Sequence, residues 1–133
     1  MAKSHGLHCA VITPERLVVE ADVDSIVLPA HDGLIGILRN RAPLLCEVGI
    51  GVLTLTGGEV GVRELFVDGG FAQVLDNEVS ILTTRAQDPA QIDRQAAATA
   101  LEAARQMKIT DEPSFDARQK AIARAKTQIS LAS

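Results

Sequence analysis

Three histidines and two cysteines are the residues of this 133-residue chain best suited to ligate a metal ion. His5, His8 and Cys9 fall within five residues of one another, whereas His31 and Cys46 stand alone. A structural zinc site needs about four ligands at a recognisable spacing, usually including a Cys-x-x-Cys pair, and the sequence has no such pair. We therefore expect no metal site, and we interpret the histidines as polar residues at strand edges.

Catalytic chemistry is not indicated by any motif either. The sequence contains no Gly-x-Ser-x-Gly elbow, no Walker-type phosphate loop and no Gly-x-Gly-x-x-Gly fingerprint. The paired acids Asp22 with Asp24 and Asp111 with Glu112 lie in polar, turn-like stretches without an apolar cleft that would adapt them to acid–base work. We expect no catalytic site and no bound cofactor.

The composition excludes two further classes of protein. Hydrophobic residues make up 47% of the chain, enough for a core of Val, Ile, Leu and Ala, but three Phe are its only aromatic residues. Such a chain lacks the aromatic platforms on which many proteins stack nucleic-acid bases. No apolar run approaches the roughly 20 residues of a membrane span, and residues 1–5 lack the apolar segment of a signal peptide. We expect neither nucleic-acid binding nor direct membrane insertion.

The elements that position these residues change in type near residue 87. Before that point, short segments rich in Val, Ile and Leu alternate with turn residues, a pattern typical of antiparallel sheets. We therefore predict a mainly β fold, with an antiparallel β-sandwich of about nine or ten strands in residues 1–87. The candidate strands are 6–13, 16–20, 23–29, 34–38, 44–48, 52–56, 59–67, 70–75 and 78–82.

Residues 88–133 predict an antiparallel hairpin of two helices as an α appendage. Asp88, followed by Pro89 and by Gln91, is typical of a capped helix start, and the alanine-rich segment 90–108 continues it. The segment 109–113 breaks this helix, and Ser114 is placed to cap the second.

The apolar faces of the two predicted helices are built mostly from alanine. They consist of Ile92, Ala96, Ala100, Ala103 and Met107 in the first helix, with Leu101 and Ala104 beside them, and of Phe115, Ile122, Ala125 and Ile129 in the second. Alanine buries little apolar area, so we expect the hairpin to dock weakly and reversibly on the sandwich. A static helical cap is the alternative that the sequence leaves open.

Charge is distributed unevenly between the two parts. Residues 1–87 carry six Lys and Arg against eleven Asp and Glu, whereas residues 88–133 carry seven against six. The end of the chain holds a basic cluster of Arg118, Lys120, Arg124 and Lys126, with Asp116 as the one acid after Phe115. Such a distribution suits protein partners, although ordinary solvated faces would have the same composition.

Three stretches resemble one known family. They are Val11–Glu15 (VITPE), Gly36–Leu45 (GILRNRAPLL) and Asp68–Val74 (DGGFAQV), the last running on to Val79–Leu82 (VSIL). Their order and spacing are similar to those of the epsilon subunit of F-type rotary ATP synthases, over residues 6–131. The resemblance implies a non-catalytic rotor subunit that links gamma to the c-ring and couples ion translocation to ATP synthesis.

The resemblance implies a gamma and c-ring interface formed by His31 and Asp32 together with Arg39, Asn40 and Arg41. The family's usual Pro-Gly-His is replaced here by Arg39-Asn40-Arg41, and Leu34 stands at a commonly acidic position. We expect Asn40 to form the turn in place of Gly, and the surface to be more cationic. Plain solvation of the two arginines is the alternative.

The resemblance also implies a nucleotide site in the hairpin, with Ile92, Asp93 and Arg124 as its matching residues. Ala96 and Gln128 stand where the family has arginines, and phosphate binding depends on clustered arginines. We therefore expect at best millimolar ATP affinity.

In the family the hairpin can extend into the α/β catalytic hexamer and inhibit ATP hydrolysis, and here the basic cluster from Arg118 to Lys126 would meet acidic residues there. The implied location is the cytoplasmic face of a bacterial inner membrane, as a peripheral protein, with the plastid thylakoid as the less favoured alternative. A soluble nucleotide-sensing module of sandwich and hairpin is the second hypothesis. A small hydrolase or metal enzyme is the third hypothesis. It would need a nucleophile–base pair or a set of metal ligands, and we find neither in the sequence.

Overall fold

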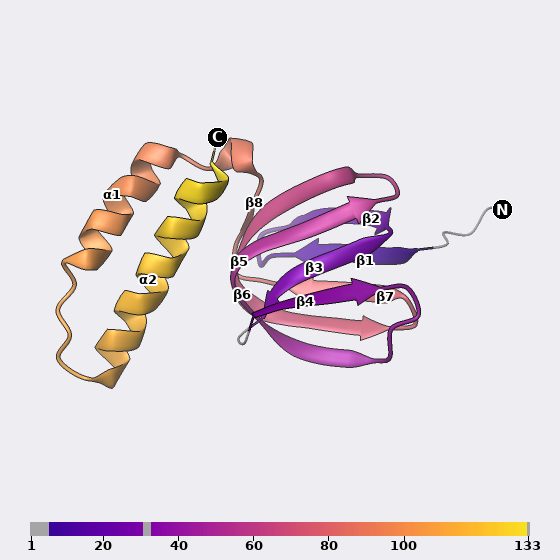
Figure 1. Ribbon diagram of the computed structural model, residues 1–133, viewed down its shortest axis with the longest axis horizontal. Coiled ribbons are helices and arrows are strands. Elements are labelled where there is room, and N and C mark those ends of the chain that lie inside the picture. Colours follow the sequence, from indigo (N-terminus) through magenta and orange to yellow (C-terminus); the bar gives the residue numbers. More distant parts are fainter. Residues whose placement is uncertain (1–5, 31–32, 133) are drawn as a thin grey trace.

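The computed structural model describes residues 6–30 and 33–132, and it consists of a β-sandwich with a helical hairpin at its side (Figure 1). Its strands are β1 (Leu7–Ile12), β2 (Leu17–Val23), β3 (Ser25–Ala30), β4 (Gly33–Leu38), β5 (Leu44–Gly57), β6 (Gly61–Leu75), β7 (Glu78–Leu82) and β8 (Ala86–Gln87). Its helices are the 3₁₀ turn η1 (Pro89–Gln91), α1 (Arg94–Arg105) and α2 (Glu112–Leu131). The predicted mainly β fold with an α appendage is confirmed.

The strands lie in the order β2-β1-β7-β6-β5-β3-β4, and β8 pairs with β6. Neighbouring strands are antiparallel except β1 and β7, which are parallel. The described residues thus form eight strands with one parallel pair, where the sequence predicted nine or ten antiparallel ones. The predicted pairs 44–48 with 52–56, and 59–67 with 70–75, each form one long strand, which reduces the nine candidates to seven, and the unpredicted β8 is the eighth strand.

Two layers arise because β5 and β6 each run through both of them. In β5 the even-numbered Val48 faces the core in the first half of the strand, whereas the odd-numbered Leu53 and Leu55 face it in the second half. The set of alternate residues that points inward therefore changes at a bend between residues 48 and 53. In β6 the same change separates Leu65 and Val67 from the buried Ala72 and Val74. We name the part with β2, β1, β7 and segments 44–48 and 70–75 layer A. Layer B contains β4, β3, β8 and segments 50–57 and 61–68.

Glycine permits the change of layer in β6. Gly69 and Gly70 have φ values of 75° and 117°, which a residue with a Cβ rarely adopts. A Cβ at Gly70 would also collide with the carbonyl oxygen of Leu82 in β7. The Asp68-Gly69-Gly70 segment is therefore the corner of the sandwich.

The hydrophobic core lies between the two layers and draws on every strand from β1 to β8. It includes Leu7, Cys9 and Val11 from β1, Ile26 and Leu28 from β3, Leu53 and Leu55 from β5, and Val79 and Ile81 from β7. No described residue of α1 or α2 belongs to this core. The sandwich therefore has a closed core of its own, and the hairpin packs outside it.

The first helix begins later than predicted. Asp88 and Gln91 do form a capping box, but it closes only the η1 turn. The helix α1 begins at Arg94, because the Asp93 carboxylate accepts a hydrogen bond from the Ala96 amide at 3.1 Å.

The second helix also has a different cap from the one predicted. Asp111, not Ser114, is its N-cap residue: the Asp111 carboxylate accepts from the Ser114 amide at 2.9 Å. The Ser114 hydroxyl in turn accepts from the Asp111 amide at 3.0 Å, which completes a capping box. Pro113 lies inside the first turn, where its missing N–H costs nothing.

The face that α1 buries is displaced by one residue from the predicted one. Ala97 and Ala104 are buried, whereas the predicted Ala96, Ala100 and Ala103 are exposed. In α2, Ala125 is buried and Ile122 and Ile129 are half-buried, but Phe115 is 44% exposed.

Candidate functional site

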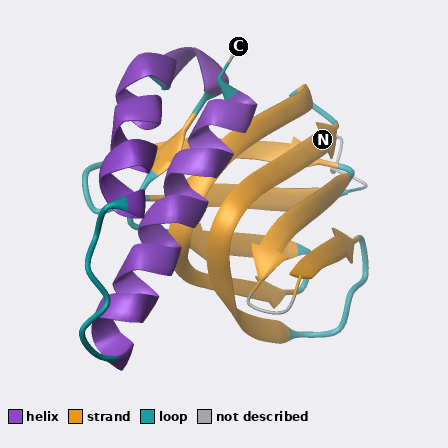
Figure 2. Cartoon of the chain, turned by 60° about the vertical axis from the view of Figure 1, so that its left-hand side comes forward, coloured by secondary structure: helices purple, strands orange, loops and turns teal. Residues whose placement is uncertain are grey.

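The hairpin lies on the outer face of layer B, with α2 against β5 and β6 and α1 packed on α2 (Figure 2). Phe66 of β6 is fully buried there, although it alternates with Leu65 and Val67, which point into the core. The alternation of a strand places Phe66 on the opposite face of the sheet from these two residues. The hairpin and the segment that leads to it therefore cover Phe66.

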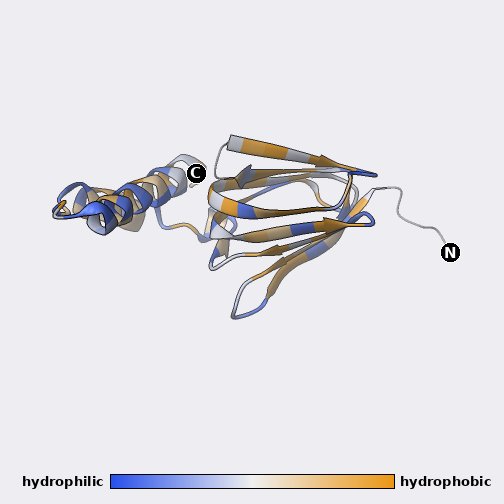
Figure 3. Cartoon of the chain, turned by 90° about the horizontal axis from the view of Figure 1, so that it is seen from below, coloured by the Kyte–Doolittle hydropathy of each residue, from blue (hydrophilic) through white to orange (hydrophobic). Residues whose placement is uncertain are grey.

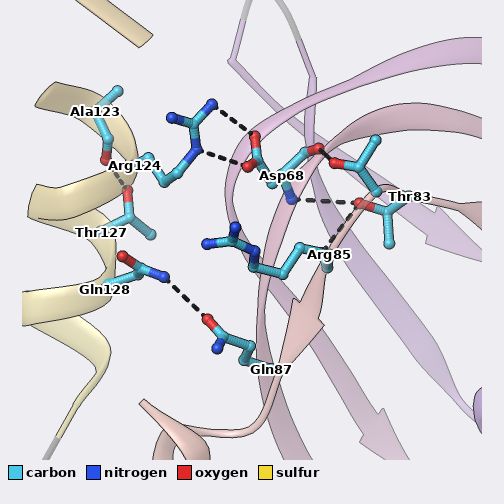
Figure 4. Close-up of polar contacts among 9 residues, drawn as sticks. Asp68, Thr83, Arg85, Gln87, Ala123, Arg124, Thr127 and Gln128 are labelled. Carbon is cyan, nitrogen blue, oxygen red and sulfur yellow. Dashed lines mark hydrogen bonds and ion pairs between the residues drawn. The ribbon is translucent and has the colours of Figure 1, made fainter. Parts of the chain in front are cut away.

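Among the residues that the structure describes, two side-chain pairs join α2 to the sandwich (Figure 4). Arg124 donates to both carboxylate oxygens of Asp68, from Nε at 2.6 Å and from Nη2 at 3.4 Å. One turn further along α2, the Gln128 amide donates to the side-chain oxygen of Gln87 in β8 at 2.9 Å. The polar part of the interface thus follows one face of α2.

Asp68 is fixed in place by its own backbone. It occupies the corner of the sandwich, and its amide lies within hydrogen-bonding distance of the Thr83 hydroxyl and of the Arg85 carbonyl, at 3.3 and 3.2 Å. Its carbonyl accepts from the Thr84 hydroxyl at 2.5 Å. The carboxylate is therefore presented to α2 by a rigid part of the fold, with its side chain only 14% exposed.

The segment between the two parts is attached separately. Asp88 forms a two-pronged ion pair with Arg63 of β6, at 3.0 Å from Nε and 2.9 Å from Nη2. This pair binds the start of η1 to layer B without involving either long helix.

The predicted basic cluster is divided between bonded and exposed side chains. Arg124 pairs with Asp68, and Arg118 donates to the Arg105 carbonyl at the end of α1 at 3.1 Å. Lys120 and Lys126 are exposed. In the docked hairpin, half of the cluster is therefore engaged in intramolecular contacts.

The residues predicted for a nucleotide site have other contacts here. Asp93 caps α1, Arg124 is paired with Asp68, and Ile92 is half-buried at the end of η1. Within the described residues, no hydrogen bond joins Asp93 to Arg124. Gln128, at an expected arginine position, contacts Gln87.

The predicted rotor interface is described in part, because His31 and Asp32 lie outside the described residues. Arg39 and Arg41 are exposed in the turn between β4 and β5. Asn40 forms this turn with a φ of 66°, which confirms that it takes the conformation that glycine would otherwise supply. Its amide donates to the Asn77 side chain at 2.6 Å, which ties the turn to the one between β6 and β7.

Sequence reasoning missed an exposed apolar row on the outer face of layer A. The strand register places Phe71 opposite Leu82, Leu82 opposite Ile12, and Ile12 opposite Leu17, across β6, β7, β1 and β2. Phe71 is 56% exposed and Leu82 52%. We call these four residues the apolar row.

One feature of the sequence could have indicated the apolar row. The strand residues Phe71 to Leu75 are largely apolar on both faces: Ala72 and Val74 point inward, and Phe71 and Leu75 flank the polar Gln73 on the outward face. Figure 3 shows hydrophobic residues along most of the strands and a larger share of hydrophilic residues along the two helices. A strand that is apolar on both faces indicates a second buried contact.

Reactive side chains are few in the described part of the chain. Burial raises the pKa of the Cys9 thiol to about 12, so that Cys9 behaves as a small apolar core residue. Hydrogen bonds that the His8 ring makes to the carboxylates of Asp22 and then Glu20 raise the pKa of His8. No group of three His, Cys, Asp or Glu among the described residues has a metal-binding arrangement.

No helix within the described ranges is both long and apolar enough to span a membrane.

Residues 6–89 match the family model of the ATP synthase delta/epsilon chain, beta-sandwich domain. The chain is 39% identical over 130 residues to the ATP synthase epsilon chain of Leptospira borgpetersenii, with 98% of each chain covered. It is 37% identical over 124 residues to the ATP synthase epsilon chain of Rhodopirellula baltica, covering 93% of this chain and 96% of that one.

Solved structures share the fold. A chain of the Euglena gracilis mitochondrial ATP synthase, from a structure of OSCP, F1 and c-ring, matches with a TM-score of 0.81 at 22% identity, covering 96% of this chain and 81% of that one. A chain of the Tetrahymena thermophila mitochondrial ATP synthase central stalk and c-ring matches with a TM-score of 0.72 at 14% identity, covering 99% and 100%. From the family model and the nearly full-length relatives, the chain belongs to the ATP synthase delta/epsilon family, as an epsilon chain.

Proposed function

We propose that the chain is a non-catalytic subunit of the central stalk of an F-type ATP synthase, where it links a gamma subunit to the polar loops of the c-ring. Through this link it couples ion translocation to ATP synthesis. The location that follows is the cytoplasmic face of a bacterial inner membrane, as a peripheral protein. Its similarity to bacterial epsilon chains supports this location.

The observation that carries this proposal is the apolar row on layer A. A row of four apolar side chains across four strands, with Phe71 and Leu82 more than half exposed, is a surface that a partner would bury. The closed core behind it makes the sandwich rigid enough to transmit torque. We assign the apolar row to the gamma subunit, and the turn with Arg39 and Arg41 to the c-ring.

Phe71→Glu tests the assignment, because it would bury a charge in an apolar interface. We expect this variant to bind gamma at least about thirtyfold more weakly, in line with the loss of an aromatic interface residue. Val62→Glu is the matched control, since Val62 is 70% exposed on layer B. Equal binding of both variants to purified gamma would contradict the assignment.

We propose further that the hairpin inhibits ATP hydrolysis when it leaves the sandwich and enters the α/β hexamer. Its position outside the sandwich core supports this, because it can depart without opening that core. Lys120 and Lys126 are already exposed, and Arg118 and Arg124 would become free for acidic partners.

We also propose that the docked hairpin binds ATP no more tightly than the millimolar range. Arg124 is engaged by Asp68, and two arginine positions of the family motif hold Ala96 and Gln128. Micromolar affinity in titration calorimetry would contradict this and favour the nucleotide-sensing alternative.

A further inference from the structure

We propose that Asp68 and Arg124 form a latch that holds the hairpin on the sandwich, and that the released hairpin turns about Ile92 and Asp93. The proposal concerns the isolated chain. Its test is therefore independent of whether the chain assembles with gamma or the c-ring.

Apart from the latch and the Gln128–Gln87 hydrogen bond, the hairpin docks through side chains that are small or only half-buried, such as Leu131. The buried residues of the two helices and their C-cap are all alanine: Ala97, Ala104, Ala125 and Ala132. An alanine methyl removes much less apolar area from water than a Leu or Phe side chain does. On the sandwich side, Phe66 is the one large side chain fully buried on the outer face of layer B, among the residues described. A single ion pair can therefore decide the balance between docked and released states.

The geometry of the latch makes it costly to lose one partner. Asp68 is 14% exposed and Arg124 33%, and both guanidinium contacts reach the same carboxylate. The backbone hydrogen bonds of Asp68 to Thr83, Thr84 and Arg85 fix the position of its main chain at the corner, beside α2. Without Arg124, the mostly buried carboxylate of Asp68 would lose its partner. Release of the hairpin would then be favoured, because it lets water solvate this charge.

The latch is the only ion pair between the two long helices and the sandwich within the described ranges. The Arg63–Asp88 pair lies before the helices, so it persists in both states and keeps η1 on layer B. Gln91 is bound to Asp88 in turn, through its amide and its side chain, each at 2.9 Å.

We place the hinge directly after the hydrogen bonds and the ion pair that hold η1 on layer B. Ile92 and Asp93 have extended backbones, with ψ values of 123° and 104°, between the η1 turn and the first residue of α1. They are the last residues before the hairpin becomes helical. Rotation about their backbone bonds moves both helices together, without breaking the capping boxes of η1 or α2.

The experiment measures the distance between two spin labels on the full chain. The labels are attached at Ser80→Cys on layer A and at Gln119→Cys on α2, both exposed positions, in a Cys9→Ala and Cys46→Ser background. The parent should give one main distance for the docked hairpin. Arg124→Gln should add a second, longer distance, with the ratio of docked to released chains reduced about fivefold or more.

Three further variants and one change of salt concentration test whether the Asp68–Arg124 pair itself controls release. Lys126→Gln, which removes an exposed charge from the same helix, should leave the distances unchanged. Asp68→Asn should release the hairpin as Arg124→Gln does, and the double variant should release no more than either single one, because both remove the same interaction. Raising NaCl should increase the released fraction of the parent but not that of Arg124→Gln.

Circular dichroism separates release from unfolding. Both latch residues lie outside the sandwich core, so each variant should keep its strand signal and a cooperative thermal transition. The proposal is overturned if folded Arg124→Gln keeps the parent distance, or if Lys126→Gln releases the hairpin to the same degree. A long distance after Arg63→Gln but not after Arg124→Gln would likewise place the latch elsewhere.

Discussion

His8 is the titratable residue whose surroundings bear most directly on the stability of layer A. Its ring nitrogens lie 2.9 Å from Asp22 and 3.0 Å from Glu20, and Glu78 of β7 is its neighbour on the other side. Asp22, and then Glu20, favour the protonated imidazolium through their hydrogen bonds with the ring, so the pKa of His8 is higher in the folded chain than its usual 6.5.

This raised pKa predicts a pH dependence with a definite sign. Stability gained from the imidazolium is fully present below pH 6.5 and is lost as the pH rises through the folded-state pKa of His8. Thermal unfolding followed from pH 6 to pH 8 should therefore show a falling contribution to Tm that His8→Gln abolishes. The effect is small, because the side chain is 42% exposed and screened by solvent. An identical pH profile for His8→Gln would remove this explanation.

Arg39 and Arg41 test the proposed c-ring contact at the level of single side chains. Both are exposed on a turn that Asn40 and Asn77 hold in shape, so Glu can replace them without disturbing the core. We expect Arg39→Glu with Arg41→Glu to reduce assembly with the c-ring, most strongly at low salt. Lys108→Glu in the hairpin is the charge control. If the c-ring co-purifies equally with both proteins, the two arginines are merely solvated.

At the scale of elements, the corner in β6 depends on glycine. Gly70→Ala should lower the free energy of unfolding by about 2 kcal/mol or more, because it adds an unfavourable positive φ to a clash with Leu82. Gly36→Ala is the matched control, since a Cβ there meets no atom within 4 Å and Gly36 has no positive φ. Urea unfolding of both variants measures the difference. Equal midpoints would show that the corner adapts without strain.

The sequence predicts the strands better than the helix details, for physical reasons. Alternation of apolar residues identifies each strand because one face must enter the core. The parallel pairing of β1 with β7 brings together segments some 70 residues apart, and no local pattern encodes it. The corners at Gly49–Gly51 and Gly69–Gly70 look like strand ends in sequence, because glycine favours both.

The buried face and the start of the first helix were predicted wrongly because neighbouring residues there are nearly equivalent in sequence. Residues 96, 97, 98, 100, 103 and 104 are all alanine, so the buried face can shift by one residue without changing the apolar pattern. Asp88 and Asp93 both suit an N-cap, and the choice between them depends on Arg63, which lies far away in the sequence and binds Asp88. The apolar row was missed for a similar reason: its residues look like ordinary strand residues until the register brings them together.

At the scale of the whole molecule, the sandwich and the hairpin give two opposite predictions for ATP hydrolysis. If a released hairpin inhibits the catalytic hexamer, removal of residues 88–133 from the reconstituted complex should raise the hydrolysis rate. The sandwich retains its core in that variant, because every member of the core cluster lies between Leu7 and Ala86. Asp68→Asn should instead lower the rate, since it releases a hairpin whose basic cluster is unchanged.

The opposite changes in hydrolysis rate expected for the two variants distinguish regulation from structural damage. A hairpin that only stabilises the stalk would make both variants change hydrolysis in the same direction, through looser assembly. Phe66 loses its cover in both variants, so its exposure cannot by itself account for opposite effects. ATPase assays on complexes of equal subunit content are the measurement, with Lys108→Gln, outside the basic cluster, as the control for charge. A rise on truncation with no fall for Asp68→Asn would retain inhibition and place its control outside the latch.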